Sequence, residues 1–468
     1  MASRDELIAR SAAYHGKGQL DEAAFELRKL LRKNPRDVQG LILSGLLECA
    51  RDDFAKGCDF LGRAEQLAPQ NLDVLMHYGT ALGDADRHEE ALAVLIRSDG
   101  LRPDDPFTQY LIGNALMGQL RTAEAAVAYG RANALDPDHL QTQWNQALAH
   151  LTLGQFEPGW PLFESRRRLA GHSSIRTFPH AVPLTPAHRL EGLRVLLYPE
   201  QGLGDTIQFA RYASVFADRG ARVQMEVQTP LLGLLQGLDS RVAILGPGDT
   251  SEAFDAYAPM MSAPWVLGSE PPPPPARPYL AATPERVAAW EARLGPRDRP
   301  RIGMVWRGSR EHGNDRRRSI GPDTFGRLFD PAYHWIAVAN EVSDADRAWL
   351  EAHDVAIHAE ALTDFSETAA LVTALDLVIT VDTSVAHLAG ALGQETWIVL
   401  AHSPDWRWML GRDDSPWYAR ARLFRQRERG DWAGVMAAVS AALTVRFSEV
   451  GRADPRPGAA NRMAQAVR

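Results

Sequence analysis

The feature that most constrains the fold is a proline that returns every 34 residues, at Pro35, Pro69, Pro103 and Pro137. The chain has 30 prolines in 468 residues. Three further hits at preset positions then have a chance of roughly 1 in 4,000, so an internal repeat is the better explanation. Small residues keep the same period at two more positions: Gly45, Gly79, Gly113 and Ala147 at the first, and Ala23, Gly57, Ala91, Ala125 and Gly159 at the second. This pattern predicts stacked helix pairs, in which small side chains let helices approach and each proline ends the second helix.

Phase and period resemble the tetratricopeptide repeat, with four full units over about residues 4–139 and a fifth, atypical unit running to about residue 170. The aromatic positions match loosely, because the counterparts of Tyr14 are Glu48, Leu82 and Leu116. The resemblance implies an α-solenoid over residues 1–170 whose groove binds a peptide or a partner protein. A scaffold that only caps or dimerises the chain is the alternative.

The fifth unit, 154-GQFEPGWPLFESRRR-168, departs from the pattern by adding Trp160 and Pro161 and by ending in three arginines. We expect it to pack against the next domain, with Arg166 to Arg168 solvated or in an interdomain position. Residues 171–192 are predicted to be a linker. Cys49 and Cys58 are the only cysteines, which excludes a disulfide framework and a cysteine zinc site.

From residue 193 onwards, short apolar runs alternate with longer amphipathic stretches. The predicted strands of a first sheet are 193–198, 221–227 and 241–245, and those of a second sheet are 301–306, 334–339, 355–359, 375–381 and 396–401. This alternation indicates two parallel sheets with helices on both faces. The expected domains are residues 171–295 and 296–446, followed by a tail, 447–468, that we predict to be disordered.

Two loops follow predicted strands, where ligands of parallel sheets bind. The first is 199-PEQGLGDTIQFARY-212 and the second is 382-DTSVAHLAGALG-393. In each, an aspartate and a threonine stand near a helix start, so that backbone N–H groups and the positive pole of the helix face the cleft. Capping of the two helices alone is the competing interpretation.

These two loops, together with 404-PDWRWMLGRDDSPWY-418, resemble the glycosyltransferase-B fold of the heptosyltransferase superfamily. The chain is most similar to the bacterial branch in which tetratricopeptide repeats are fused to that fold. The resemblance covers residues 1 to about 446. It implies a tetratricopeptide α-solenoid followed by two Rossmann-like parallel-sheet domains, the first for the acceptor and the second for a nucleotide sugar. Relatives in this branch include enzymes that glycosylate proteins such as flagellin.

By this resemblance the catalytic residues are Asp205, as the base for the acceptor hydroxyl, and His387, which would hydrogen-bond the donor phosphate or sugar. Gly202 and Gly204 would let the backbone come close to donor or acceptor.

The donor phosphate would be held by Asp382, Thr383 and Ser384 in the second loop, through backbone amides and hydroxyls. For Asp405, Trp406 and Trp408 a role in bracing the donor pocket or a domain contact stands beside simple packing.

Charge neutralisation of the leaving group is expected from 306-WRGSREHGNDRRRS-319, which has arginines and no lysine. Arg307 is one candidate. One residue of the run Arg316, Arg317 and Arg318 is the other, with Arg317 at its centre taken to represent it.

No metal cofactor is expected, and the sequences Asp84-Ala-Asp86 and Asp344-Ala-Asp346 are interpreted as solvated turns. The formal net charge of −8 argues against nucleic acid as a partner. No apolar stretch reaches the length of a membrane span, and the start lacks the order of a signal peptide. We therefore expect a cytoplasmic protein without membrane insertion.

The sequence thus predicts a metal-independent glycosyltransferase that uses a nucleotide sugar and modifies a hydroxyl of a protein recruited by the repeats. Flagellin is the best single guess for that acceptor, by resemblance alone. Transfer to lipopolysaccharide or another saccharide and an inactive repeat scaffold remain alternatives.

Overall fold

The computed structural model describes residues 2–169, 176–249, 253–269, 278–308 and 318–448. The chain divides into two compact units. Unit 1 comprises Met1–Ile175 together with two short later segments, Pro264–Pro271 and Asp405–Leu410. Unit 2 comprises Arg176–Ala263, Pro272–Pro404 and Gly411–Arg468.

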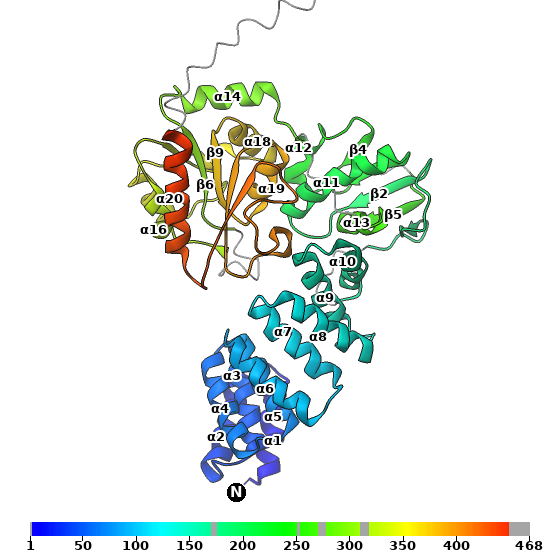
Figure 1. Ribbon diagram of the computed structural model, residues 1–468, viewed down its shortest axis with the longest axis vertical. Helices are drawn as coiled ribbons and strands as arrows, with labels where there is room; N and C mark the ends of the chain where they lie inside the picture. The colour runs from blue at the N-terminus through cyan, green and yellow to red at the C-terminus, as the bar shows by residue number, and fades with distance from the viewer. Residues whose placement is uncertain (1, 170–175, 250–252, 270–277, 309–317, 449–468) are drawn as a thin grey trace, which may run out of the picture. The chain divides into compact units, whose positions relative to one another are not determined.

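Unit 1 is an α-solenoid of antiparallel helix pairs, as the repeat predicts (Figure 1). Its helices are α1 (Arg4–His15), α2 (Leu20–Lys33), α3 (Val38–Cys49), α4 (Phe54–Leu67), α5 (Leu72–Asp84), α6 (His88–Leu101), α7 (Pro106–Gly118), α8 (Thr122–Leu135), α9 (Leu140–Thr152) and α10 (Phe156–Phe163). The fold class expected for the first part of the chain is therefore confirmed.

The small residues of the repeat do what their position predicts. A Cβ atom at Gly45 would overlap Leu61 of the partner helix, and at Gly113 it would overlap Tyr129. A cap also recurs with the period, because Asp37, Asn71 and Asp105 each accept a hydrogen bond from the backbone N–H three residues later. Each cap satisfies one orphan donor and marks the start of a first helix.

The end of the solenoid is built around aromatic rings. Trp160 is fully buried and packs edge-on against Trp406, with ring centroids 5.4 Å apart. Trp406 belongs to the 3₁₀ helix η6 (Trp406–Trp408), so residues 405–410 complete the core of unit 1. Arg166 is also fully buried, donating to the Phe163 carbonyl and paired with Glu164. A solvated position was therefore the wrong expectation for Arg166, since local acceptors satisfy its guanidinium.

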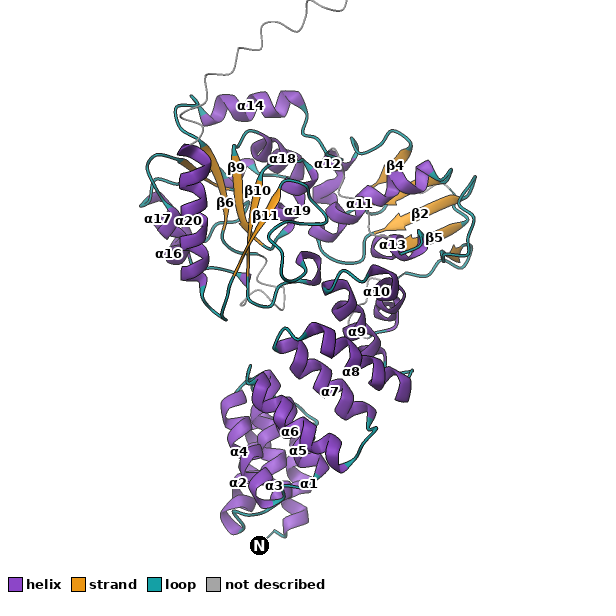
Figure 2. Ribbon diagram, in the orientation of Figure 1, coloured by secondary structure: helices purple, strands orange, loops and turns teal. Residues whose placement is uncertain are grey.

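The first sheet of unit 2 has the order β1-β5-β2-β3-β4, and all its strand pairs are parallel. Figure 2 labels β2, β4 and β5 of this sheet, with α11 beside them. Its strands are β1 (Val182–Pro183), β2 (Arg194–Tyr198), β3 (Arg222–Glu226), β4 (Val242–Leu245) and β5 (Ala256–Pro259). The accompanying helices are α11 (Leu203–Asp218), α12 (Leu232–Leu235) and α13 (Ala263–Val266). Sequence patterning missed β5 and β1, and part of the predicted linker forms β1. Strand β1 has two residues and β5 includes a proline, so neither forms an apolar run that the pattern would identify as a strand.

The second sheet has the order β11-β10-β9-β6-β7-β8 and is also parallel throughout. Its strands are β6 (Arg301–Val305), β7 (His334–Ala337), β8 (Ala356–Ile357), β9 (Leu377–Val381), β10 (Thr396–Leu400) and β11 (Ala421–Arg425). Its helices are α14 (Pro284–Leu294), α16 (Pro322–Phe325), α17 (Asp344–Glu351), α18 (Phe365–Thr373), α19 (Ser384–Ala391) and α20 (Trp432–Ser448). Strands β6, β9 and β10 are buried along their whole length, as expected of central strands covered on both faces. Within the described residues, no helix combines the length and apolarity that crossing a bilayer requires.

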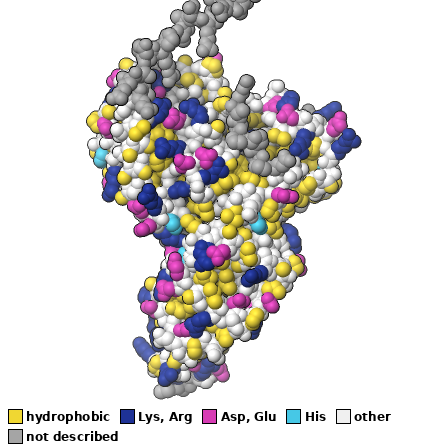
Figure 3. Space-filling view, viewed as in Figure 1, with side chains coloured by type: hydrophobic (Ala, Val, Ile, Leu, Met, Phe, Trp, Pro, Cys, Tyr) yellow, Lys and Arg dark blue, Asp and Glu magenta, His cyan; other side chains and the backbone are white. Residues whose placement is uncertain are grey.

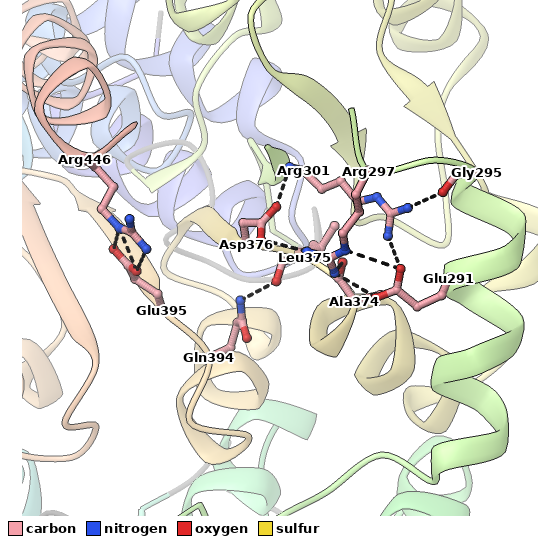
Figure 4. A network of polar contacts seen from close by, with 10 residues as sticks. All are labelled: Glu291, Gly295, Arg297, Arg301, Ala374, Leu375, Asp376, Gln394, Glu395 and Arg446. Atoms are coloured by element: carbon pink, nitrogen blue, oxygen red, sulfur yellow. Dashed lines mark hydrogen bonds and ion pairs between the residues drawn. The ribbon is translucent and has the colours of Figure 1, made fainter. Parts of the chain in front are cut away.

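An ion-pair network ties α14 to the start of the second sheet (Figure 4). Arg301 is fully buried and pairs with Glu291, while Arg297 bridges Glu291 and Asp376. Asp376 also accepts a hydrogen bond from the Arg301 N–H, at 2.8 Å. Burial would raise the pKa of Glu291, but hydrogen bonds from Arg297 and Arg301 outweigh it, and the pKa is lowered.

Replacing Glu291 by Gln is expected to lower the free energy of unfolding at neutral pH by about 2 kcal/mol, because it removes the carboxylate from a buried guanidinium. The loss stays below that of a fully buried pair, since the Glu291 side chain is 38% exposed. A lowered folded-state pKa contributes stability above the unfolded pKa and loses it as the pH falls through the folded value. The difference between variant and wild type should therefore shrink as the pH falls below the usual pKa of a glutamate and through the lowered pKa of Glu291. Urea unfolding of wild type and variant from neutral to acidic pH measures this difference in stability, and the exposed Glu428→Gln variant is the control. A difference in stability that is independent of pH would contradict the prediction.

Candidate functional site

The two loops singled out in the sequence meet in unit 2. A Cβ atom at Gly204, in the first turn of α11, would lie 2.9 Å from Cδ2 of His387 and 3.3 Å from Cα of Ser384. The first turn of α19 therefore packs directly against the first turn of α11. Only glycine allows this approach, so both helix starts, with their backbone N–H groups and positive poles, lie at one place.

Asp205 is the third residue of α11 and is partly exposed. Its Oδ2 accepts a hydrogen bond of 2.9 Å from the backbone N–H of Gly202, the N-cap residue. The competing interpretation, a carboxylate that serves its own helix start, is thus part of what Asp205 does. The same hydrogen bond also fixes the orientation of the carboxylate beside α19, as a positioned base would require.

The start of α19 is not capped by a side chain of its own. Thr383 is the N-cap residue, yet its hydroxyl contacts the Thr380 hydroxyl, at 3.1 Å, instead of the helix backbone. Asp382 directly follows the buried strand β9. The loop predicted to hold a donor phosphate therefore has backbone donors that no side chain of the loop itself caps.

His387 is buried in α19, with 6% of its surface exposed. Its Nδ1 lies 2.8 Å from the hydroxyl oxygen of Tyr418, which orients the ring. The Tyr418 ring in turn occupies the space that a Cβ at Gly390 would take. Tyr418 therefore positions His387, and the tautomer of His387 follows from which of the two groups donates.

A buried arginine braces this arrangement. Arg211 of α11 donates to the carbonyl of Trp417, at 3.0 Å, and to the hydroxyl of Tyr279, at 3.1 Å. Its guanidinium lies over the Tyr418 ring, 5.1 Å from the ring centroid. Tyr279 completes the link by donating to the Ile207 carbonyl. Sequence reasoning missed Arg211, Tyr279 and Tyr418, because their partners lie far away in the chain; an arginine inside the buried face of a helix was the one available signal.

The two arginine candidates differ in their surroundings. Arg307 forms an ion pair with Asp346 and donates to the hydroxyl of Ser343. Asp346 is 7% exposed, so the expectation of a solvated turn was wrong for it. Arg318 instead donates from Nη1 to the backbone carbonyl of Asp382, at 2.9 Å. Among the described residues of the run, Arg318 is thus the one that reaches the donor loop, and Arg316 and Arg317 lie outside the described residues, as does the tail beyond residue 448.

Asp405, Trp406 and Trp408 belong to unit 1, whereas the residues of this site belong to unit 2. Trp406 and Trp408 are buried, and Asp405 accepts from the Arg407 backbone N–H. Their contacts are those of core packing, which was one of the two interpretations left open.

Comparison with known proteins adds an independent observation. Residues 333–430, which span most of the second sheet and the whole α19 loop, match the model of glycosyltransferase family 9 (heptosyltransferase). This part of the chain is similar to a family 9 glycosyltransferase domain. The chain as a whole is a tetratricopeptide solenoid fused to that fold, and the resemblance seen in the sequence is confirmed.

Three known proteins are similar to the chain over different parts of its length. Protein FlbA of Caulobacter vibrioides is 25% identical over 453 residues, covering 80% of this chain and 73% of FlbA. Cellulose synthase 2 operon protein C of Komagataeibacter xylinus is 30% identical over 115 residues, which are 24% of this chain and 9% of that protein. A crystal structure of MamA aligns with 33% of this chain and 91% of its own, at 19% identity and a TM-score of 0.31.

Proposed function

We propose that this chain transfers a sugar from a nucleotide-sugar donor to a hydroxyl group of a protein acceptor that its solenoid recruits. The observation that carries the proposal is the close packing of Gly204 against Ser384 and His387, inside a chain whose second sheet is similar to a family 9 domain. It brings a candidate base and a candidate phosphate site together, as glycosyl transfer requires.

In this mechanism Asp205 removes the proton from the acceptor hydroxyl as that oxygen attacks the anomeric carbon of the donor. The bond from that carbon to the leaving phosphate oxygen breaks at the same time. The start of α19 and Arg318 stabilise the negative charge that develops on the leaving group. Because these groups supply the positive charge, the proposal includes no metal, and EDTA should leave the rate unchanged.

The test of the function is transfer itself. Purified full-length chain is incubated with a panel of radiolabelled nucleotide sugars and with protein from a strain lacking the gene, and incorporation into protein is measured. Flagellin is the acceptor to test first, on the resemblance described above. Incorporation into protein supports the proposal, whereas binding of no nucleotide sugar in calorimetry would favour an inactive scaffold.

Transfer to a saccharide is a second candidate, favoured by the word heptosyltransferase in the description of the matched family. It predicts an altered lipopolysaccharide and a normal gel mobility of flagellin in a deletion strain. Label in lipopolysaccharide rather than in protein would replace the first proposal with this one.

A test of recruitment by the solenoid needs a deletion that leaves the buried core of its last repeats intact. Removing residues up to 169 would take away the partners of the buried Trp406, so loss of activity would carry no information about recruitment. Deleting residues 2–103 removes the first three repeats and keeps α9 and α10. We expect this variant to lose acceptor modification and to keep donor binding; the reverse would reject recruitment.

Replacing Tyr418 by Phe is expected to lower kcat about tenfold while changing KM for the donor little, because the ring stays and the hydroxyl that orients His387 is lost. Steady-state kinetics measures both constants. The control is Tyr129→Phe, which removes a comparable buried hydroxyl, bound to Asn114 at 2.7 Å in the solenoid. Both variants should lose about 1 kcal/mol of stability, and equal kcat values for the two would contradict the positioning role.

A further inference from the structure

The first two repeats form a cavity of about 530 Å³ between α2, α3 and α4, and this cavity is open to solvent. Its apolar lining comes from Ala24, Leu31, Leu47 and Phe60. Its charged lining consists of Arg28, Arg32, Arg51, Lys56, Arg63 and Glu48. Five cations and one carboxylate around an apolar floor make a site for a ligand that is anionic and partly apolar.

The repeat supplies its own comparison, because the same helix junction recurs one and two periods later. Thirty-four residues on, the six charged positions hold Gly62, Gln66, Ala85, Glu90, Arg97 and Leu82. After another period they hold Ile96, Gly100, Gln119, Glu124, Arg131 and Leu116. Each later junction therefore keeps one cation of the five, and only the first is strongly cationic.

The cation that recurs at the later junctions has a structural role. Arg63 donates to the carbonyl of Pro35, at 3.2 Å, and Arg97 donates to the carbonyl of Pro69, at 3.0 Å. Both bonds span 28 residues and tie one repeat to the next. The solenoid thus uses an arginine at this position, but its packing does not require cations at the other four.

Two of those four cations are compensated and two are not. Arg51 pairs with Asp21 and Glu48, and Lys56 pairs with Asp53. The ion pairs formed within the described part of the chain include neither Arg28 nor Arg32, and both side chains are exposed. Elsewhere, on the face that Figure 3 shows, charges of the two signs are interspersed.

We propose that this cavity binds an acidic peptide segment of a partner protein. Arg28 and Arg32, one turn apart on α2, hold its carboxylates, and an apolar side chain beside them rests on Leu47 and Phe60. Nucleic acid fits less well, because the cations are confined to one junction of a chain with net charge −8. The inference rests on the proposed function only in that it names the chemistry by which the solenoid recruits its acceptor.

The test measures peptide binding to the full-length chain without any nucleotide sugar. The probe is a fluorescein-labelled peptide with the core Asp-Glu-Leu-Glu-Asp between Gly-Ser flanks, followed by fluorescence anisotropy. The double variant R28E/R32E is expected to weaken binding at least roughly tenfold, since it places like charges against the ligand. Exposed side chains tolerate this change, which circular dichroism verifies. The control is R131E, a charge reversal at an exposed position that corresponds to Arg63 two repeats later, and it should bind as wild type does.

Four outcomes would overturn the proposal: no binding by wild type, equal binding of an Asn-Gln-Leu-Gln-Asn peptide, equal loss in R131E, or tighter binding of a DNA oligonucleotide at the same site. Failure of the proposed function would give a different set of results from failure of the cavity proposal. D205N should bind the peptide like wild type, so peptide binding without sugar transfer rejects the enzyme and retains the cavity. Transfer by a chain that does not bind the peptide rejects the cavity alone.

Discussion

Replacing Asp205 by Asn is expected to lower kcat/KM about 100- to 10,000-fold, the range that general-base assistance contributes. The amide cannot take a proton from the acceptor hydroxyl. Its oxygen can still accept the hydrogen bond from the Gly202 N–H, so α11 should keep its start and the protein its stability. Transfer assays with purified enzyme, together with urea unfolding, separate the two effects.

The control for Asp205 lies on the same helix. Asp218 stands at the other end of α11, exposed and paired with Arg241. Asp218→Asn should change the rate by less than about twofold, since a surface ion pair contributes little. Activity of D205N close to that of D218N would show that Asp205 only serves the helix start.

The second large effect is expected at Arg318. Removing its side chain in Arg318→Ala should lower kcat/KM about 100- to 1,000-fold, as the loss of one preorganised donor for a developing negative charge does. Arg318→Lys should restore part of the rate, because it returns the charge without the planar fork of donors. Steady-state kinetics with the donor measures both variants, and calorimetry with the nucleoside diphosphate follows binding of the leaving group.

Arg307 provides the comparison for this prediction. Its guanidinium pairs with the buried Asp346, so Arg307→Ala should cost about 3 kcal/mol of stability by stranding that carboxylate. Its effect on kcat/KM, measured where the variant is still folded, should be far smaller than that of Arg318→Ala. The opposite order would place the leaving group beside Arg307.

Much of the fold follows from local pattern. The period of 34 predicted the helix pairs, and Gly45 and Gly113 lie where their small size is needed. The central strands were predicted because a fully buried parallel strand is a continuous apolar run. Strands β1, β5 and β11 were missed, since β1 has two residues and β5 includes a proline. Strand β11 lies at the edge of the second sheet and has arginines at two of its five positions, so it is no continuous apolar run.

The candidate site, like the fold, has a part that could be predicted from the sequence and a part that could not. The places of Asp205, Asp382 and His387 could be predicted, because each lies just after a strand or in the first turns of a helix. Their chemical roles stay predictions. The choice between arginines could not, since Arg307 and Arg318 lie in one loop and differ only in the partners that the fold brings to them.

The sequence by itself determined the repeat, the two parallel sheets and the two loops that carry the proposed chemistry. These depend on residues near one another in the chain, whose periodicity reports burial directly. Only the tertiary structure decided that Gly204 packs on His387, that Tyr418 orients that histidine, and that Arg211 braces them both. Such contacts join residues up to about two hundred positions apart, and no local pattern encodes which distant side chain will fill a given space.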